Sequence, residues 1–249
     1  MDATVEIRRL VKVYHDDTRG EIRAVDGIDL EVRRGEVMGL LGVNGAGKTT
    51  TLRILATILS PTSGTALVMG HDVTAEPEEA RRSLGYYSST TALYPRLTAR
   101  ETLEFFARIN GYPPGLVRRR VDELIEGMGM SRFAGSRVEK LSQGMKQKVS
   151  IARTIVHEPG VLIFDEPTAW LDVLNAHDML EMIRDLGRSG HTVVFSTHIM
   201  SEAQKICDRI AIIHSGRIKA VGTPESLMSS TGTPSLEEAF VRLVRGGEV

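Results

Sequence analysis

Cysteine is almost absent from this chain, since Cys207 is the only one among 249 residues. A single thiol cannot form an internal disulfide and is typical of a protein from a reducing compartment. The seven histidines never follow an H-x-x-x-H spacing, so we expect no structural zinc site. Stabilisation by disulfides or by zinc is therefore not expected.

Long hydrophobic runs are also missing. Runs such as the one at 161–164 are far shorter than the roughly 18 residues that a membrane-spanning helix needs. The first ten residues, MDATVEIRRL, lack the apolar centre of a signal peptide. We therefore expect a cytoplasmic chain; if it works at a membrane, another polypeptide must supply the membrane-spanning segments.

The chain has no large excess of charge of either sign, with a formal net charge of −1. Such a balance offers no general attraction to nucleic acid, and we expect no nucleic-acid partner. The one basic cluster, residues 118–120, has two interpretations: a solvated helix face, or a contact with a lipid headgroup or a partner. The hydrophobic content of 41% is ordinary for a globular protein.

Several short apolar segments predict an α/β fold. The first thirty residues alternate as half-buried strands do, and residues 37–41 form an unbroken apolar run that ends next to a glycine. A helix is expected from Lys48 to about Leu59. Two later apolar runs, at 161–164 and 192–196, each lead into a polar turn and a helix. This order predicts a largely parallel sheet covered on both faces.

Between about residues 98 and 158 the pattern becomes helical throughout. Thr98 and Glu101 form a capping box, and so do Ser235 and Glu238 ahead of a short C-terminal helix. Another helix is expected to begin at Ser142, where free backbone N–H groups and the helix dipole favour an anion. The helical stretch is therefore interpreted as an insertion in the α/β core.

Residues 42–49, Gly-Val-Asn-Gly-Ala-Gly-Lys-Thr, follow the pattern G-x-x-x-x-G-K-[ST] between a strand and a helix. In this pattern glycines let the backbone approach phosphate oxygens closely. Lys48 would reach the β- and γ-phosphates, and Thr49 would give a hydroxyl to Mg²⁺. The alternative is an ordinary glycine-rich turn.

Asp165 and Glu166 stand at the end of the apolar run 161–164. Neighbouring side chains at a strand end point in different directions, so the two carboxylates can have separate roles. Asp165 would hold Mg²⁺, and Glu166 would polarise the attacking water. The alternative is that both acids only solvate a loop.

With these motifs in place, nearly the whole chain resembles the ATPase subunits of ABC transporters. Residues 141–145, Leu-Ser-Gln-Gly-Met, resemble the family's signature segment, and residues 166–172 resemble its acidic strand end and interface loop. Tyr14 corresponds to the ring that stacks on adenine, or else is a surface strand residue. His198 corresponds to the histidine that contacts the γ-phosphate.

The resemblance implies a P-loop NTPase (RecA-like) core with an N-terminal antiparallel β part. It implies one nucleotide-binding domain over 1–249, with a helical subdomain inserted at about 90–158 and a C-terminal helical extension at about 224–249. It also implies catalytic residues (Glu166, His198), ATP-binding residues (Tyr14, Asn44, Gly45, Ala46, Gly47, Lys48, Thr49, Thr50, Ser142, Gly144) and Mg²⁺ ligands (Thr49, Asp165).

The family pattern further implies a dimer of two such subunits, in which Ser142 and Gly144 bind the ATP held by the other copy. Four positions depart from it: Gln143 and Met145 stand in the signature, Ser89 replaces a glutamine, and Trp170 replaces a glycine. Ser89 is too short for the glutamine's direct Mg²⁺ contact, although a water could bridge it. Trp170 is either an anchor for the partner subunit or a tolerated rim residue.

The expected function is ATP hydrolysis that powers a membrane exporter through a separate transmembrane permease. Residues 94–103 and 196–203 are most similar to sodium-export ATPases, while drug, antibiotic, lipid and polysaccharide exporters stay open. A non-transport factor of the family would usually have two cassettes or a coiled coil, and neither is evident. An unrelated GTPase or kinase is disfavoured by the signature segment and His198.

Overall fold

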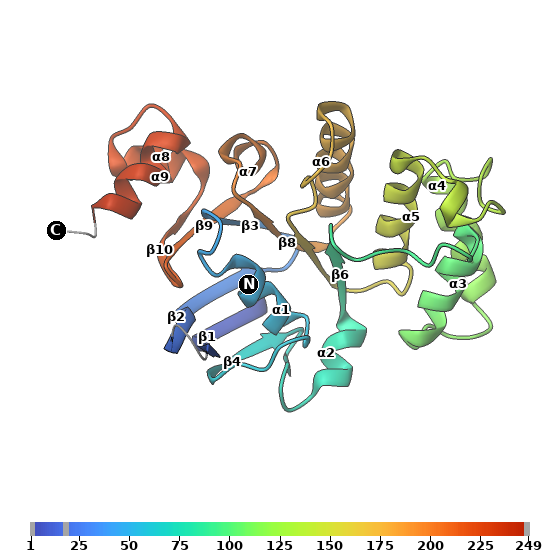
Figure 1. Cartoon of the computed structure of the whole chain (residues 1–249), viewed down its shortest axis with the longest axis horizontal. Coiled ribbons are helices and arrows are strands. Elements are labelled where there is room, and N and C mark those ends of the chain that lie inside the picture. Colours follow the sequence, from blue (N-terminus) through green and yellow to red (C-terminus); the bar gives the residue numbers. More distant parts are fainter. Residues whose placement is uncertain (1–2, 17–19, 247–249) are drawn as a thin grey trace.

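The computed structural model describes residues 3–16 and 20–246, which fold around two β-sheets (Figure 1). The strands are β1 (Ala3–Asp16), β2 (Gly20–Arg33), β3 (Val37–Leu41), β4 (Ser63–Val68), β5 (His71–Asp72), β6 (Leu84–Ser88), β7 (Val161–Asp165), β8 (Thr192–Thr197), β9 (Arg209–His214) and β10 (Arg217–Gly222). The helices are α1 (Lys48–Leu55), α2 (Pro77–Ser83), α3 (Ala99–Ile109), α4 (Val117–Gly127), α5 (Gln143–Ile155), α6 (Val173–Arg188), α7 (Met200–Ile206), α8 (Pro224–Thr231) and α9 (Leu236–Arg245). The last three residues of the expected extension lie outside the described part.

The larger sheet has the strand order β10-β9-β3-β8-β7-β6 and is parallel except for β10. All five residues of β3 are buried, because the strand lies between β9 and β8 and both of its faces are covered. A strand in that position is an unbroken apolar run. The carboxyl ends of β3, β8 and β7 lie at the same edge, which is where an open parallel sheet places its ligand.

The smaller sheet is antiparallel, with the order β2-β1-β4-β5. Its inner face packs against the larger sheet and α1, so that Ile7, Val25, Met38, Leu52 and Ile163 share one buried cluster. Figure 1 shows β1, β2 and β4 together below the larger sheet. This packing brings β1 beside the loop that follows β3.

Helices α3, α4 and α5 form a group at one end of the molecule, and α8 and α9 lie at the other end (Figure 1). Leu103, Val121 and Val149 connect the group to the buried face of the larger sheet. The capping box predicted at Thr98 is confirmed, because Thr98 accepts from the Glu101 N–H and the Glu101 side chain accepts in return. At Ser235 the structure gives the first of these two contacts, from the Glu238 N–H, but not the reciprocal one. No helix in the described residues has the length and apolar character that crossing a membrane requires.

One predicted boundary is wrong. Helix α1 ends at Leu55 and not at about Leu59. Thr57 has a φ of 58°, and the N–H groups of Ile58 and Leu59 both donate to the Arg53 carbonyl oxygen. A left-handed residue of this kind stops an α-helix.

Candidate functional site

The loop between β3 and α1 borders a cavity of about 510 Å³. Gly47 has a φ of 107°, and a Cβ at this position would collide with the Ala24 carbonyl oxygen. Only glycine therefore fits here. The cavity is lined by Tyr14, Ile22, Arg23, Ala24, Asn44, Gly45, Gly47, Lys48, Thr49, Thr50, Glu166 and Ser215.

Lys48 supplies a buried positive charge to this cavity, with 5% of the residue exposed. Its Nζ donates to the carbonyl oxygens of Gly42, at 2.7 Å, and Val43, at 3.2 Å. The same Nζ lies 3.1 Å from Glu166 Oε1. An ammonium group has three donors, so these partners satisfy all of them.

Asp165 is the second charged group of the site and comes from the end of β7. Its Oδ1 accepts from the hydroxyls of Thr49, at 3.0 Å, and Ser196, at 2.8 Å, and its Oδ2 accepts from Tyr86 at 3.2 Å. Burial, together with the negative charge of Asp165, raises the pKa of Tyr86 to about 12. Tyr86 therefore stays protonated near neutral pH and remains a donor to the carboxylate.

The oxygen atoms of Asp165 and Thr49 form a donor set that suits Mg²⁺, which prefers hard oxygen ligands and is commonly held by one or two carboxylates. They lie 3.0 Å apart, Asp165 is 3% exposed, and two further hydroxyls orient the carboxylate. These residues therefore fit the ion. When bound, Mg²⁺ would act as a Lewis acid that polarises phosphate oxygens.

Glu166 follows Asp165 directly and adopts a left-handed backbone conformation, with a φ of 47°. Its N–H donates to Ser196 Oγ at 3.0 Å, and its carboxylate lies between Lys48 and His198, whose Nδ1 is 2.7 Å from Oε2. Non-glycine residues rarely adopt such a φ, because it brings the side chain close to the backbone. The turn aims the carboxylate toward the phosphate loop.

The structure brings most of the predicted site residues together. Seven of the predicted nucleotide-binding and metal residues line the cavity with Glu166, and hydrogen bonds join Asp165 and His198 to this group. Ala46 is different, because it is buried and its N–H donates to the Val43 carbonyl oxygen at 3.2 Å. It does not line the cavity.

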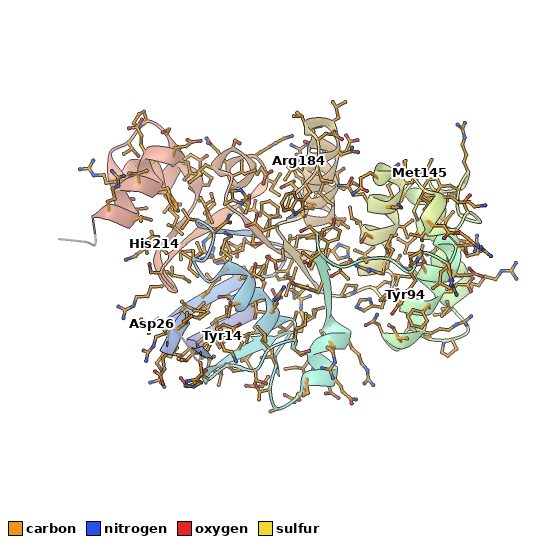
Figure 2. All side chains as sticks on the ribbon, viewed as in Figure 1. Tyr14, Asp26, Tyr94, Met145, Arg184 and His214 are labelled. Carbon is orange, nitrogen blue, oxygen red and sulfur yellow. The ribbon has the colours of Figure 1, made fainter. Side chains whose placement is uncertain are left out.

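Ser142 and Gly144 do not belong to this group. Ser142 caps the start of α5 as predicted, by accepting from the Met145 N–H at 3.3 Å. Figure 2 shows Met145, in the same helical turn, well away from Tyr14. Within one chain the start of α5 therefore cannot touch a nucleotide in this cavity.

Two of the departures from the family pattern have clear positions. Ser89 does not line the nucleotide cavity and instead borders a separate cavity of about 290 Å³ beside α5. Trp170 is 94% exposed and has a φ of 68°. That conformation favours glycine, the residue usual at this place in the family pattern.

Two contributors to the site were not assigned a role from the sequence. Ser196 links the side chain of Asp165 to the backbone of Glu166, and Tyr86 supports Asp165 from β6. Ser196 is a polar residue near the end of an apolar strand, a signal too common to assign a role, and Tyr86 lies in the middle of β6 without such a signal.

Comparison with known proteins agrees with this geometry. The family described as ABC transporter matches residues 25–169. The chain is 40% identical to the ABC transporter ATP-binding protein NatA of Bacillus subtilis, over 92% of this chain and 94% of the relative. It is 42% identical to the daunorubicin/doxorubicin resistance ATP-binding protein DrrA of Streptomyces peucetius, over 92% and 68% respectively.

Solved structures resemble the chain over most of its length. An ATP-binding subunit of an ABC transporter aligns with a TM-score of 0.83 at 33% identity, covering 96% of this chain and 99% of the other. The dimeric cassette MJ0796 aligns with a TM-score of 0.76 at 26% identity, covering 88% and 98%. The predicted P-loop NTPase fold is thereby confirmed. The chain belongs to the ABC transporter family, as an ATP-binding and ATP-hydrolysing subunit.

Proposed function

We propose that this chain powers a membrane exporter by hydrolysing ATP between two copies of itself. The proposal rests on one observation: the Glu166 carboxylate contacts both Lys48 and His198 beside the phosphate loop. Asp165 lies next to them, hydrogen-bonded to Thr49. Lys48 would bind the β- and γ-phosphates, and Thr49 and Asp165 would hold Mg²⁺. Glu166 would polarise the attacking water, and His198 would orient Glu166 and contact the γ-phosphate.

The dimer is proposed because one chain leaves its own Ser142 and Gly144 outside the cavity. The start of α5 offers backbone N–H groups and the positive end of a helix of 13 residues, which suit a phosphate. A second copy packed head to tail would bring this helix start to the first copy's nucleotide. A related cassette is described as a dimer.

Substitution of Glu166 by glutamine tests both ideas. Glu166→Gln retains the side-chain shape but loses the base, so ATP hydrolysis should fall by roughly a hundredfold or more. ATP should then hold the variant as a dimer in sedimentation velocity. The matched control is the double variant Lys48→Ala/Glu166→Gln, which should stay monomeric because it binds ATP poorly. A Glu166→Gln chain that hydrolyses ATP at the parental rate, or remains monomeric with saturating ATP, contradicts the proposal.

A separate transmembrane permease is the proposed partner, and it would hold the chain at the inner face of the membrane. A groove of about 290 Å³ lies between β6, residues 91–94, α3 and α5, where a helix of the permease could dock. Tyr94, Phe105 and Ile109 near this groove are exposed apolar side chains. Such side chains are typical of a surface that binds a partner helix. Isolation of the chain from native membranes should recover a polytopic membrane protein in a fixed ratio.

For the cargo we propose sodium ions, on the similarity of residues 94–103 and 196–203 to sodium-export ATPases. Drug export is the second candidate, because of the 42% identity to a daunorubicin/doxorubicin resistance protein. The purified complex in sealed vesicles should show ATP-driven transport of ²²Na⁺ and none of daunorubicin. Transport of daunorubicin alone would replace the first proposal with the second.

A further inference from the structure

The groove that we propose for the permease has an unusual charge at its wall. It is lined by Ala56, Arg81, Leu84, Gly85, Tyr86, Thr91, Ala92, Tyr94, Phe106, Asn110, Arg153, Thr154 and His157. Two of these side chains are arginines and none is a carboxylate. Burial lowers the pKa of His157, so the histidine is neutral near pH 7 and the arginines carry the charge.

Arg153, from α5, is buried, with 5% of the residue exposed. Its guanidinium lies 5.1 Å from the centroid of the Phe106 ring. Within residues 3–16 and 20–246 the structure gives this guanidinium no hydrogen bond and no ion pair. Buried arginines are normally paired with a carboxylate or with several acceptors, because an unpaired charge away from water is costly.

The environment of Arg153 is correspondingly unfavourable. Burial lowers the pKa of its guanidinium from the ordinary value, although the group keeps its proton. Lys48, a second buried cation among the described residues, has two carbonyl oxygens and a carboxylate as partners. Arg153 has only an aromatic face.

The opening of the groove is apolar and aromatic. The ring of Tyr94 lies 5.8 Å from that of Phe105 and 6.4 Å from that of Phe106. Ile109, one helical turn beyond Phe105, is 58% exposed. Figure 2 shows Tyr94 at the helical group formed by α3, α4 and α5. An amphipathic helix could place apolar side chains on this rim while one polar side chain reaches the wall.

We infer that the groove receives an aspartate or glutamate from a cytoplasmic helix of the permease, and that Arg153 binds this carboxylate. The inference rests on the proposed function, since it names the chemistry of the proposed partner. A guanidinium presents a planar pair of donors that matches a carboxylate, and the Phe106 ring holds its plane in place. Arg81 adds positive charge to the same groove.

The groove also touches the catalytic site. Tyr86 lines the groove and donates its hydroxyl to Asp165 Oδ2 at 3.2 Å. Only Tyr86 therefore separates a side chain docked in the groove from Asp165, the proposed Mg²⁺ ligand. Docking of the permease would thus act on Asp165 through Tyr86, without a glutamine at position 89.

Replacement of Arg153 by methionine tests the inference. A buried charge without a partner contributes little to the fold, so the isolated Arg153→Met chain should keep its melting temperature or gain stability. Its ATPase rate without permease should stay within about twofold of the parent. Its affinity for the purified permease in detergent should fall by roughly thirtyfold or more, as when one member of a buried interfacial charge pair is removed.

The matched control is Arg118→Gln, which removes an exposed arginine from α4 in the same group of helices. This variant should bind the permease as the parent does. Arg153→Lys keeps the charge without the planar fork and should give an intermediate loss. If the methionine variant fails to fold, the loss of affinity in Arg153→Lys tests the inference in its place.

A cross-link identifies the occupant without changing Arg153. With p-benzoylphenylalanine in place of Ile109, the intact complex should cross-link to a permease segment that has Asp or Glu within one helical turn. Neutralising that acid should weaken binding to the parent but not further weaken binding to Arg153→Met. Unchanged binding by Arg153→Met, or a cross-linked segment without an acid, overturns the inference and leaves the proposed function standing. If the parent chain binds no permease at all, the proposed function fails as well.

Discussion

The hydroxyl of Ser196 is the smallest group on which the catalytic arrangement depends. It donates to Asp165 Oδ1 at 2.8 Å and accepts from the Glu166 N–H at 3.0 Å, and Ser196 is fully buried. Ser196→Ala removes both contacts without creating a cavity larger than one oxygen atom. We expect the variant to fold and to hold Glu166 less firmly.

The size of the effect follows from the two bonds. A hydrogen bond to a charged group contributes about 1.5–3 kcal/mol, and a buried N–H left without a partner costs about 1–3 kcal/mol. Thr49 and Tyr86 still hold Asp165, which limits the first loss. The free energy of unfolding should therefore fall by about 2–4 kcal/mol. For a chain of this size, each kcal/mol lowers the melting temperature by about 2–4 °C.

The catalytic effect should exceed what instability alone would cause. Glu166 keeps its contacts with Lys48 and His198 but loses the anchor of its backbone, so its carboxylate can move by a fraction of an ångström or more. Displacements of about 1 Å cost up to roughly a hundredfold in rate. Measured well below the melting temperature, kcat should fall roughly tenfold to a hundredfold, with a much smaller change in ATP affinity.

Ser150→Ala is the matched control, because Ser150 is a buried serine whose hydroxyl has no hydrogen bond within the described residues. Urea unfolding and steady-state ATPase assays on both variants decide the matter. If Ser196→Ala loses no more stability than Ser150→Ala, the hydrogen bonds do not stabilise the site. If it loses stability but keeps full kcat, Ser196 supports only the fold, and the positioning argument is refuted.

Three further predictions concern single residues. Trp170→Gly should be more stable to urea than Trp170→Ala by about 1 kcal/mol, because only glycine adopts a φ near 68° without strain; equal stability would contradict this. Burial raises the pKa of the Cys207 thiol. A disulfide reagent at pH 8 should therefore react with Cys207 only as fast as the chain unfolds. Reaction at the rate of a free thiol would contradict the buried position. The raised pKa of Tyr86, about 12 against an ordinary 10, means that its contribution to stability is complete below pH 10 and is lost toward pH 12. Alkaline denaturation should therefore be less steep in Tyr86→Phe than in the parent, and identical curves would contradict the shift.

The sequence predicted the parts of the site that depend on one strand at a time. Lys48, Asp165 and His198 each follow an apolar run, and a parallel sheet brings the ends of such runs to one edge. A single apolar run in the sequence does not show which strands will be its neighbours in the sheet, or in which register they will pair. The sequence therefore predicted the edge and its charged groups, but not the contacts between them.

Strand order explains why Ser196 and Tyr86 were missed. Asp165 pairs with Ser196 across β7 and β8, and with Ser88 across β7 and β6. The order β3-β8-β7-β6 places β8 between the phosphate loop and Asp165's own strand. Once this order is known, Ser196 near the end of β8 can be recognised as the residue that links Asp165 and Glu166. The same reasoning applies to Arg153, which looks like an exposed helix residue until the packing of α5 against β6 is known.

The contact between Lys48 and Glu166 suggests how binding and chemistry are ordered in the proposed mechanism. In the structure all three donors of Lys48 have partners, and one of these is the carboxylate that would polarise water. A phosphate that takes Lys48 must replace at least one partner. The two backbone carbonyl oxygens belong to the loop itself, so the Glu166 carboxylate is the partner that can leave. Glu166 would then keep only its contact with His198, at 2.7 Å from Oε2. Its other carboxylate oxygen, Oε1, would be released from Lys48 and free to polarise water while the phosphate is bound.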